Sequence, residues 1–143
     1  MELQAVLVAV PQVIVADVGR TVGFIRQHAS EYGVDPNRIG AVGGSAGGQL
    51  ALLLGTTADS GDPSAADVVL RESSRVAAVV AYFPPTYLFR WGNRRAFPAT
   101  ATLTEAEAAQ FSPIRSVSPR AAPSLILHGD ADMTVPIIIG LRQ

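Results

Sequence analysis

Cysteine is absent from the 143-residue sequence. Its absence excludes disulfide bonds, a thiol nucleophile and cysteine metal sites, although it does not decide the cellular compartment. Histidine is scarce as well: the sequence contains only His28 and His128, and no spacing pairs them as metal ligands. We therefore expect neither a metal nor a cofactor.

An excess of charge and a long apolar run are also missing. Eleven basic and twelve acidic residues leave a net charge of −1, which gives no electrostatic basis for binding nucleic acid or an anionic membrane. The apolar stretch Ala5 to Ala16 is interrupted by Pro11 and is too short to span a bilayer. Met1-Glu2 supplies no basic leader, so we expect no signal peptide and a cytoplasmic protein.

The composition that is present suits one folded domain. Hydrophobic residues make up 48% of the chain and charged residues 16%, as in soluble globular proteins. Strand-like runs alternate with helical stretches, which predicts a mostly parallel sheet with helices on both faces. We expect residues 1–143 to form a single α/β domain.

The expected elements can be placed along the chain. Apolar residues at steps of three and four predict a helix that begins near Pro11 and ends before Gly33. Thr104 to Glu107 has the pattern of a capping box that opens a short helix. The remaining expectations are a strand or irregular lead-in over 3–10, a buried strand over 38–42, a helix to about 57, a surface loop over 58–72, a strand covered on both faces over 76–83, a loop or cap over 86–101 and a buried strand over 124–128.

A glycine-rich stretch between the predicted strand 38–42 and the helix after it carries the clearest chemical signal. Within it, Gly43-x-Ser45-x-Gly47 fits the nucleophile-elbow pattern, in which a serine sits at a sharp strand-to-helix turn. The residues two before and two after are expected to be small, so that the chain can double back. The N–H of Ala46 would lie at the positive end of the helix and could bind a developing oxyanion. The alternative is a glycine-rich turn with an incidental serine.

A nucleotide site is a second interpretation of the glycines, and the sequence argues against it. The stretch contains no Gly-x-Gly-x-x-Gly, because Ser45 stands where the second glycine should be, and no lysine follows as in a P-loop.

Several segments in order resemble the α/β-hydrolase superfamily, specifically the carboxylesterase and lipase-like group with a Gly-Gly-Ser-Ala-Gly-Gly elbow. The resemblance extends from about Pro11 to Pro136. It rests on the elbow and on three further segments, which are Tyr32-Gly33-Val34-Asp35-Pro36-Asn37-Arg38-Ile39, Tyr82-Phe83-Pro84-Pro85-Thr86 and Leu127-His128-Gly129-Asp130-Ala131-Asp132-Met133-Thr134-Val135-Pro136.

The resemblance implies a serine hydrolase that acts on small acyl esters. Ser45 would be the nucleophile, Ala46 would provide an oxyanion N–H, and Asp132 would be the acid that orients a histidine. Asp130 is the rival acid, with Asp132 favoured because it aligns with the acid of the family's loop. Arg94 and Arg95 could meet an acidic group of the substrate, but a solvated loop is the preferred interpretation.

Two departures from the family pattern limit the expected activity. The acid should be followed by a histidine, and none follows Asp132; the His-Gly-Gly oxyanion loop is also absent. His128 and His28 are both expected to be structural, so the chain resembles a middle segment of a larger hydrolase with an incomplete core. A weak esterase is expected; the alternative is a non-catalytic module that binds a ligand or partner. The apolar Ile137-Ile138-Ile139 and an unpaired sheet edge predict self-association.

Overall fold

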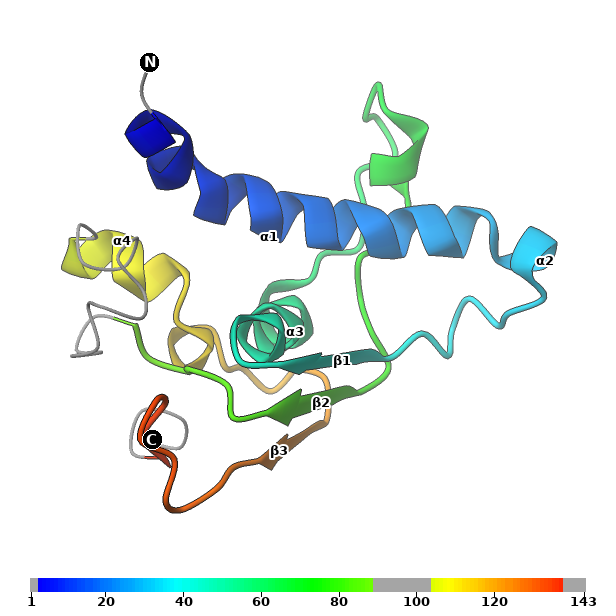
Figure 1. Ribbon diagram of the computed structural model, residues 1–143. Coiled ribbons are helices and arrows are strands. Elements are labelled where there is room, and N and C mark those ends of the chain that lie inside the picture. Colours follow the sequence, from blue (N-terminus) through cyan, green and yellow to red (C-terminus); the bar gives the residue numbers. More distant parts are fainter. Residues whose placement is uncertain (1–2, 89–103, 138–143) are drawn as a thin grey trace.

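Three parallel strands form the centre of the computed structural model, which describes residues 3–88 and 104–137 (Figure 1). The strands are β1 (Ala41–Gly44), β2 (Val79–Tyr82) and β3 (Ser124–Leu127), in the order β1-β2-β3. Val80 pairs with Val42 on one side and Leu125 on the other. The predicted parallel sheet is therefore confirmed, and the carboxyl ends of all three strands meet at one edge.

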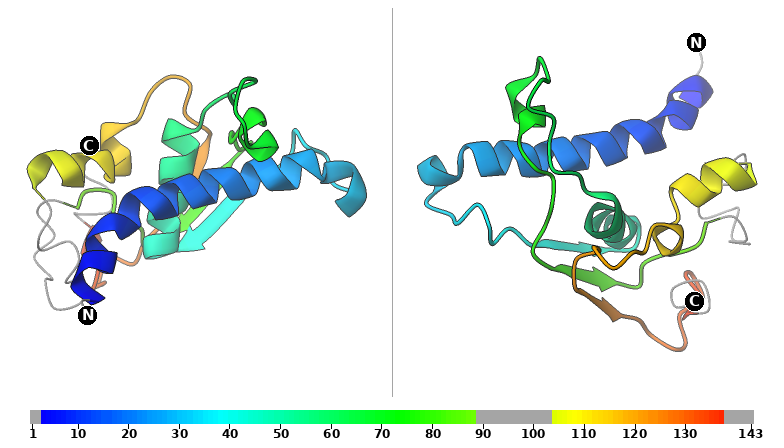
Figure 2. Two further views of the ribbon diagram at one scale, coloured as in Figure 1. Left: turned by 90° about the horizontal axis from the view of Figure 1, so that it is seen from above. Right: turned by 180° about the vertical axis from the view of Figure 1, so that it is seen from behind.

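Helices cover one face of this sheet. Helix α3 (Ala46–Thr57) packs directly on β1 and β2, and α1 (Leu3–Gln27) crosses over α3 (Figure 2). The remaining elements are short: α2 (Ala29–Tyr32), η1 (Val68–Arg71), α4 (Glu105–Gln110) and η3 (Pro113–Arg115). None of the helices in the described ranges is both long and apolar enough to cross a membrane.

The main core lies between α3 and the sheet. Leu52 and Leu54 of α3, Val79 and Ala81 of β2 and Val22 of α1 are all buried there. Val22 belongs to the apolar face predicted for the first helix, and its burial confirms that face. A second cluster joins Leu88, Ala108, Phe111 and Val135 near the carboxyl ends of the strands.

The prediction of a strand or irregular lead-in over residues 3–10 was wrong. These residues form the first turns of α1, which continues through Pro11 to Gln27. Leucine, glutamine and alanine favour helix, and Pro11 bends the helix without ending it, although a proline removes one backbone hydrogen bond and its ring crowds the carbonyl of the preceding turn. Figure 1 shows the first turns of α1 set at an angle to the rest.

The predicted cover on both faces of the sheet is not found in the described residues. Val42 is 72% exposed, Tyr82 43%, Leu125 57% and Leu127 41%, and all four lie on the face opposite α3, because side chains alternate along a strand. We call these four residues the open face. The sequence analysis predicted buried strands over 38–42 and 124–128 and a strand covered on both sides over 76–83. For the open face, these predictions were wrong.

Local features of the chain follow the prediction more closely. Gly33 adopts the left-handed conformation, with φ of 66°, after α2. The Thr104 hydroxyl accepts the N–H of Glu107, whose carboxylate accepts the N–H of Thr104, so the capping box is confirmed. Residues 58–72 form a loop that contains only η1. Arg94, Arg95, Ile138 and Ile139 lie outside the described residues.

Candidate active site

Ser45 occupies the turn that joins β1 to α3. Its backbone has φ of 53° and ψ of −123°, a conformation that costs a non-glycine residue about 1–3 kcal/mol. Neighbouring elements hold it from both sides: the Ser45 N–H donates to the carbonyl of Tyr82 (2.9 Å), and its own carbonyl accepts the N–H of Gln49 (3.0 Å). The strained turn expected of a nucleophile elbow is therefore present.

Glycine at position 43 is required by the path of the chain. A Cβ at Gly43 would lie 2.3 Å from both the carbonyl carbon and the oxygen of Gly47. A Cβ at Gly47, by contrast, would have nothing within 4 Å outside its own helix. The expectation that both positions must be small is thus correct for Gly43 and wrong for Gly47.

The start of α3 leaves hydrogen-bond donors beside Ser45. The first N–H groups of a helix have no partner within it, and the Ser45 side chain makes no capping bond to them. The Ala46 N–H is the first of these groups and stands at the positive end of a 12-residue helix. A negative oxygen held next to the Ser45 hydroxyl would be stabilised at this position.

Asp132 lies in the loop after β3, at the same edge of the sheet. Its Oδ1 accepts the N–H groups of Thr134 (2.8 Å) and Val135 (2.9 Å). The bond from the Val135 N–H, and then that from Thr134, lower the pKa of Asp132 below its ordinary value. The nearby His128 ring lowers this pKa further. Oδ2 lies 3.9 Å from Nε2 of His128, which is too far for a hydrogen bond.

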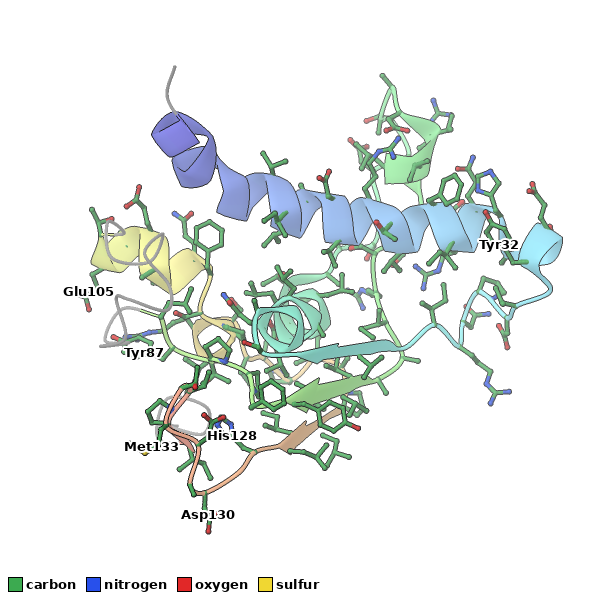
Figure 3. All side chains as sticks on the ribbon, viewed as in Figure 1. Tyr32, Tyr87, Glu105, His128, Asp130 and Met133 are labelled. Carbon is green, nitrogen blue, oxygen red and sulfur yellow. The ribbon has the colours of Figure 1, made fainter. Side chains whose placement is uncertain are left out.

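Asp130, the rival acid, is placed differently. Its side chain is exposed and points away from the body of the protein (Figure 3). The Asp132 side chain is only 22% exposed and is fixed by two loop amides. The geometry therefore favours Asp132 over Asp130 for any role that needs a fixed carboxylate.

Each of the two histidines contacts a backbone carbonyl, and no hydrogen bond joins either ring to Ser45. His28 follows α1; its Nδ1 contacts the carbonyl of Phe24 at 2.9 Å, and the centroids of the two rings lie 4.2 Å apart. The His128 side chain is 1% exposed, and its Nε2 contacts the carbonyl of Val135 at 2.7 Å. Both histidines thus bond to backbone carbonyls, as the structural interpretation expected.

Ser45 and Asp132 follow the two outer strands of the sheet. β2 lies between β1 and β3, and a spacing of about 4.8 Å per strand places the axes of β1 and β3 about 10 Å apart. The candidate site therefore consists of a serine and a carboxylate at the same edge of the sheet, in the segments that follow the strands on either side of β2.

Phe83 is a residue at this edge to which the sequence analysis gave no role. It follows β2, between the two ends that carry Ser45 and Asp132, and it is the only described residue besides Ser45 that has a positive φ without being glycine (39°). Its N–H donates to the carbonyl of Leu127 (2.7 Å), and its half-exposed ring would lie 3.3 Å from a Cβ at Gly44. Pro84-Pro85 after an apolar strand marked the turn, but only the structure shows this ring beside the elbow.

A cavity of about 440 Å³ lies elsewhere, between α1, α3 and the loop 58–74. Val18, Leu54 and Val69 are among its apolar walls, and neither Ser45 nor Asp132 lines it. The Arg20 side chain at this cavity is already paired with Asp67 at 2.8 Å. This cavity is therefore separate from the serine and carboxylate site.

Comparisons with known proteins place this geometry in a family context. The model of the BD-FAE family matches residues 4–139. The probable carboxylic ester hydrolase LipM of Mycobacterium tuberculosis is 31% identical over 135 residues, which cover 86% of this chain and 31% of LipM. The chain spans about a third of the length of the curated relatives it matches.

Solved structures give the same picture. An acetyl ester-xyloside bifunctional hydrolase from Caldicellulosiruptor lactoaceticus is 30% identical with a TM-score of 0.79, over 88% of this chain and 47% of that one. Esterase 2 of Thermogutta terrifontis with bound propionate is 35% identical with a TM-score of 0.65, over 86% of this chain and 44% of that one. The same esterase is known with butyrate bound and phosphoramylated by tabun.

Proposed function

The chain belongs to the BD-FAE family of α/β-hydrolase-like domains, and from this premise we propose that it carries the nucleophile and the acid of a carboxylic ester hydrolase. Ser45 is the nucleophile, the Ala46 N–H binds the oxyanion, and Asp132 is the acid. The relatives matched over most of this chain are named esterases and carboxylic ester hydrolases, which supports the reaction class.

The observation that carries the proposal is the backbone of Ser45. A serine at φ of 53° and ψ of −123° between a strand and a helix stands at a turn whose strain must be offset by surrounding contacts. Such a turn presents the hydroxyl beside the first N–H groups of the helix, where an acyl carbonyl can be attacked and its oxygen stabilised.

The proposed reaction is acyl transfer to the serine. Ser45 Oγ forms a bond to the ester carbonyl carbon while its proton passes to a base, and the alcohol leaves with a proton as the carbonyl re-forms. Water then releases the carboxylic acid from the acyl-serine. Among the described residues both histidines bond to backbone carbonyls, so we expect these residues by themselves to give only about 10³–10⁴ over the uncatalysed reaction, from binding and oxyanion contacts.

Short acyl chains are the proposed substrates. The similar solved structures include a hydrolase named for acetyl esters and an esterase with propionate or butyrate bound. In this chain the half-exposed Phe83 ring beside Gly44 narrows the edge next to Ser45, which favours a small acyl group over a long one.

A fluorophosphonate probe tests the nucleophile. We expect the probe to label the wild-type chain covalently but slowly, because the oxyanion-binding N–H assists attack of the Ser45 hydroxyl on phosphorus while neither His28 nor His128 bonds to that hydroxyl. Ser45→Ala should abolish the label. Ser60→Ala, in the exposed loop 58–72, is the matched control and should label normally. Unlabelled wild type, or label that survives Ser45→Ala, would contradict the proposal.

The open face supports a second candidate function, a module that binds a second copy of this chain. Four large apolar side chains of the sheet are exposed together on it, and the outer edges of β1 and β3 have no strand partner among the described residues. The sheet face measures roughly 200 Å² from its strand spacing and rise, well below the ~800 Å² per partner of a stable dimer. The association should therefore be weak and depend on concentration.

Sedimentation velocity over a range of concentrations tests this association. We expect the sedimentation coefficient of the wild type to rise with concentration, and Leu125→Lys/Leu127→Lys to remain monomeric because each lysine places a charge on the open face. Val68→Lys/Val117→Lys, at exposed valines outside the sheet, is the control and should associate as the wild type does. A wild type that is monomeric at every concentration would exclude this function.

A further inference from the structure

His128 is a buried titratable side chain that the proposed reaction does not use. It follows β3 directly, and 1% of its side chain is exposed. Nε2 lies 2.7 Å from the carbonyl oxygen of Val135. A carbonyl oxygen can only accept, so Nε2 carries the hydrogen of this bond.

The bond from His128 closes the loop that carries Asp132. It joins the first residue of the loop to Val135, whose side chain is only 1% exposed and belongs to the second core cluster. The N–H of Val135 in turn donates to Oδ1 of Asp132 at 2.9 Å. The backbone of Val135 is therefore held on its carbonyl side by His128 and bound on its amide side to the carboxylate.

This arrangement leaves one carboxylate oxygen of Asp132 for another donor. Oδ1 accepts the two loop amides. Oδ2 is 3.9 Å from His128 Nε2, and that nitrogen already donates to Val135. Within the described part of the chain, His128 thus fixes the loop without donating to Oδ2, which is the oxygen to which the imidazole of a catalytic base would donate.

The need to fill the buried space at position 128 does not explain why the residue there is a histidine. Nδ1 of His128 is buried and has no hydrogen-bond partner among the described residues, and a buried polar atom without a partner costs about 1–3 kcal/mol. An apolar ring would avoid that cost. What a histidine supplies here, and phenylalanine could not, is the Nε2–H donor.

We propose that His128 is a positioning residue for Asp132, in that its Nε2–H bond to Val135 holds the loop in the geometry that engages Oδ1 with the loop amides and leaves Oδ2 for a second donor. The inference rests on the proposed function for its catalytic meaning. The structural part of the inference is that one N–H donor, Nε2–H of His128, fixes the loop that carries Asp132. This part can be tested without measuring catalysis.

The tautomer of His128 is the first test, and it needs no variant at this position. Nitrogen-15 NMR of the wild type should show the hydrogen of the neutral His128 ring on Nε2 and none on Nδ1. His28→Phe removes the other imidazole and assigns the signals. Hydrogen on Nδ1 of His128 would overturn the proposal, since Nε2 could then not donate to Val135.

Titration of Asp132 by carboxyl carbon-13 NMR is the second test. The lowered pKa of Asp132 comes mainly from the amides of Val135 and Thr134, so it reports whether the loop is held. We expect His128→Phe to raise this pKa toward the ordinary carboxyl value. His128→Gln should keep it low, because the glutamine amide can place an N–H near the position of Nε2.

A control and a folding check complete the experiment. Val79→Ala, at a buried position of β2, lowers stability by loss of packing and should leave the pKa of Asp132 unchanged. An unchanged pKa in folded His128→Phe would overturn the proposal. Should that variant not fold, His128→Gln decides: a pKa that stays low supports positioning, and one at the ordinary value overturns it. Unlabelled Ser45 alongside the expected titrations would reject the proposed function alone.

Discussion

Gly43→Ala is expected to destabilise the protein by about 3 kcal/mol or more, the upper part of the range for an overpacked site. The added Cβ would lie 2.3 Å from the carbonyl carbon and oxygen of Gly47. Both are backbone atoms at the start of α3, and no side-chain rotation can relieve the overlap. The elbow must open, which pulls α3 away from β1. Chemical denaturation followed by circular dichroism measures the loss.

Gly47→Ala is the matched control for this prediction. The same methyl group is added four residues later, where nothing outside the helix lies within 4 Å. Alanine loses less backbone entropy than glycine on entering a helix, so we expect a gain of up to about 1 kcal/mol. Equal losses in the two variants would show that the chain does not cross itself at Gly43 as described.

Imidazole added to the wild-type chain is expected to accelerate the hydrolysis of an acetate ester by at least about tenfold. A positioned general base contributes about 10²–10⁴, and a free imidazole recovers part of that by binding between the Ser45 hydroxyl and the Asp132 carboxylate. One ring nitrogen would accept the proton of Ser45, while the other N–H donates to Oδ2 of Asp132.

The control variants separate this effect from catalysis by imidazole in solution. The rate is measured with a weakly activated ester such as phenyl acetate, so that the direct reaction with imidazole stays small. Ser45→Ala should reduce the imidazole-dependent rate to that of buffer. Asp132→Asn keeps an oxygen for the loop amides, loses the charge, and should lower the enhancement. The same imidazole dependence in wild type and Ser45→Ala would rule out this arrangement.

The features that could be predicted from the sequence are those determined by neighbouring residues. The elbow at Ser45, the turn at Gly33 and the capping box at Thr104 each depend on backbone geometry within a few positions, so their residue types indicate them directly. The parallel sheet followed from the alternation of strands and helices, and the comparisons confirm the α/β-hydrolase resemblance. The roles of Ser45, Ala46 and Asp132 remain predictions.

The features that could not be predicted depend on contacts between distant segments. An apolar run such as 76–83 has the same composition whether one face or both are covered, so the exposure of Tyr82 was not visible in it. Asp130 and Asp132 stand two positions apart, and only the bonds from Thr134 and Val135 show which carboxylate is held. The burial of His128 likewise depends on Val135, seven residues further along.

A crystal structure of the chain after reaction with a fluorophosphonate would test the central claim most directly. The account predicts phosphorus bonded to Ser45 Oγ, a phosphonyl oxygen within hydrogen-bond distance of the Ala46 N–H, and a positive φ at residue 45. Phosphorus on another side chain, or Ser45 in relaxed helical or extended backbone, would contradict it.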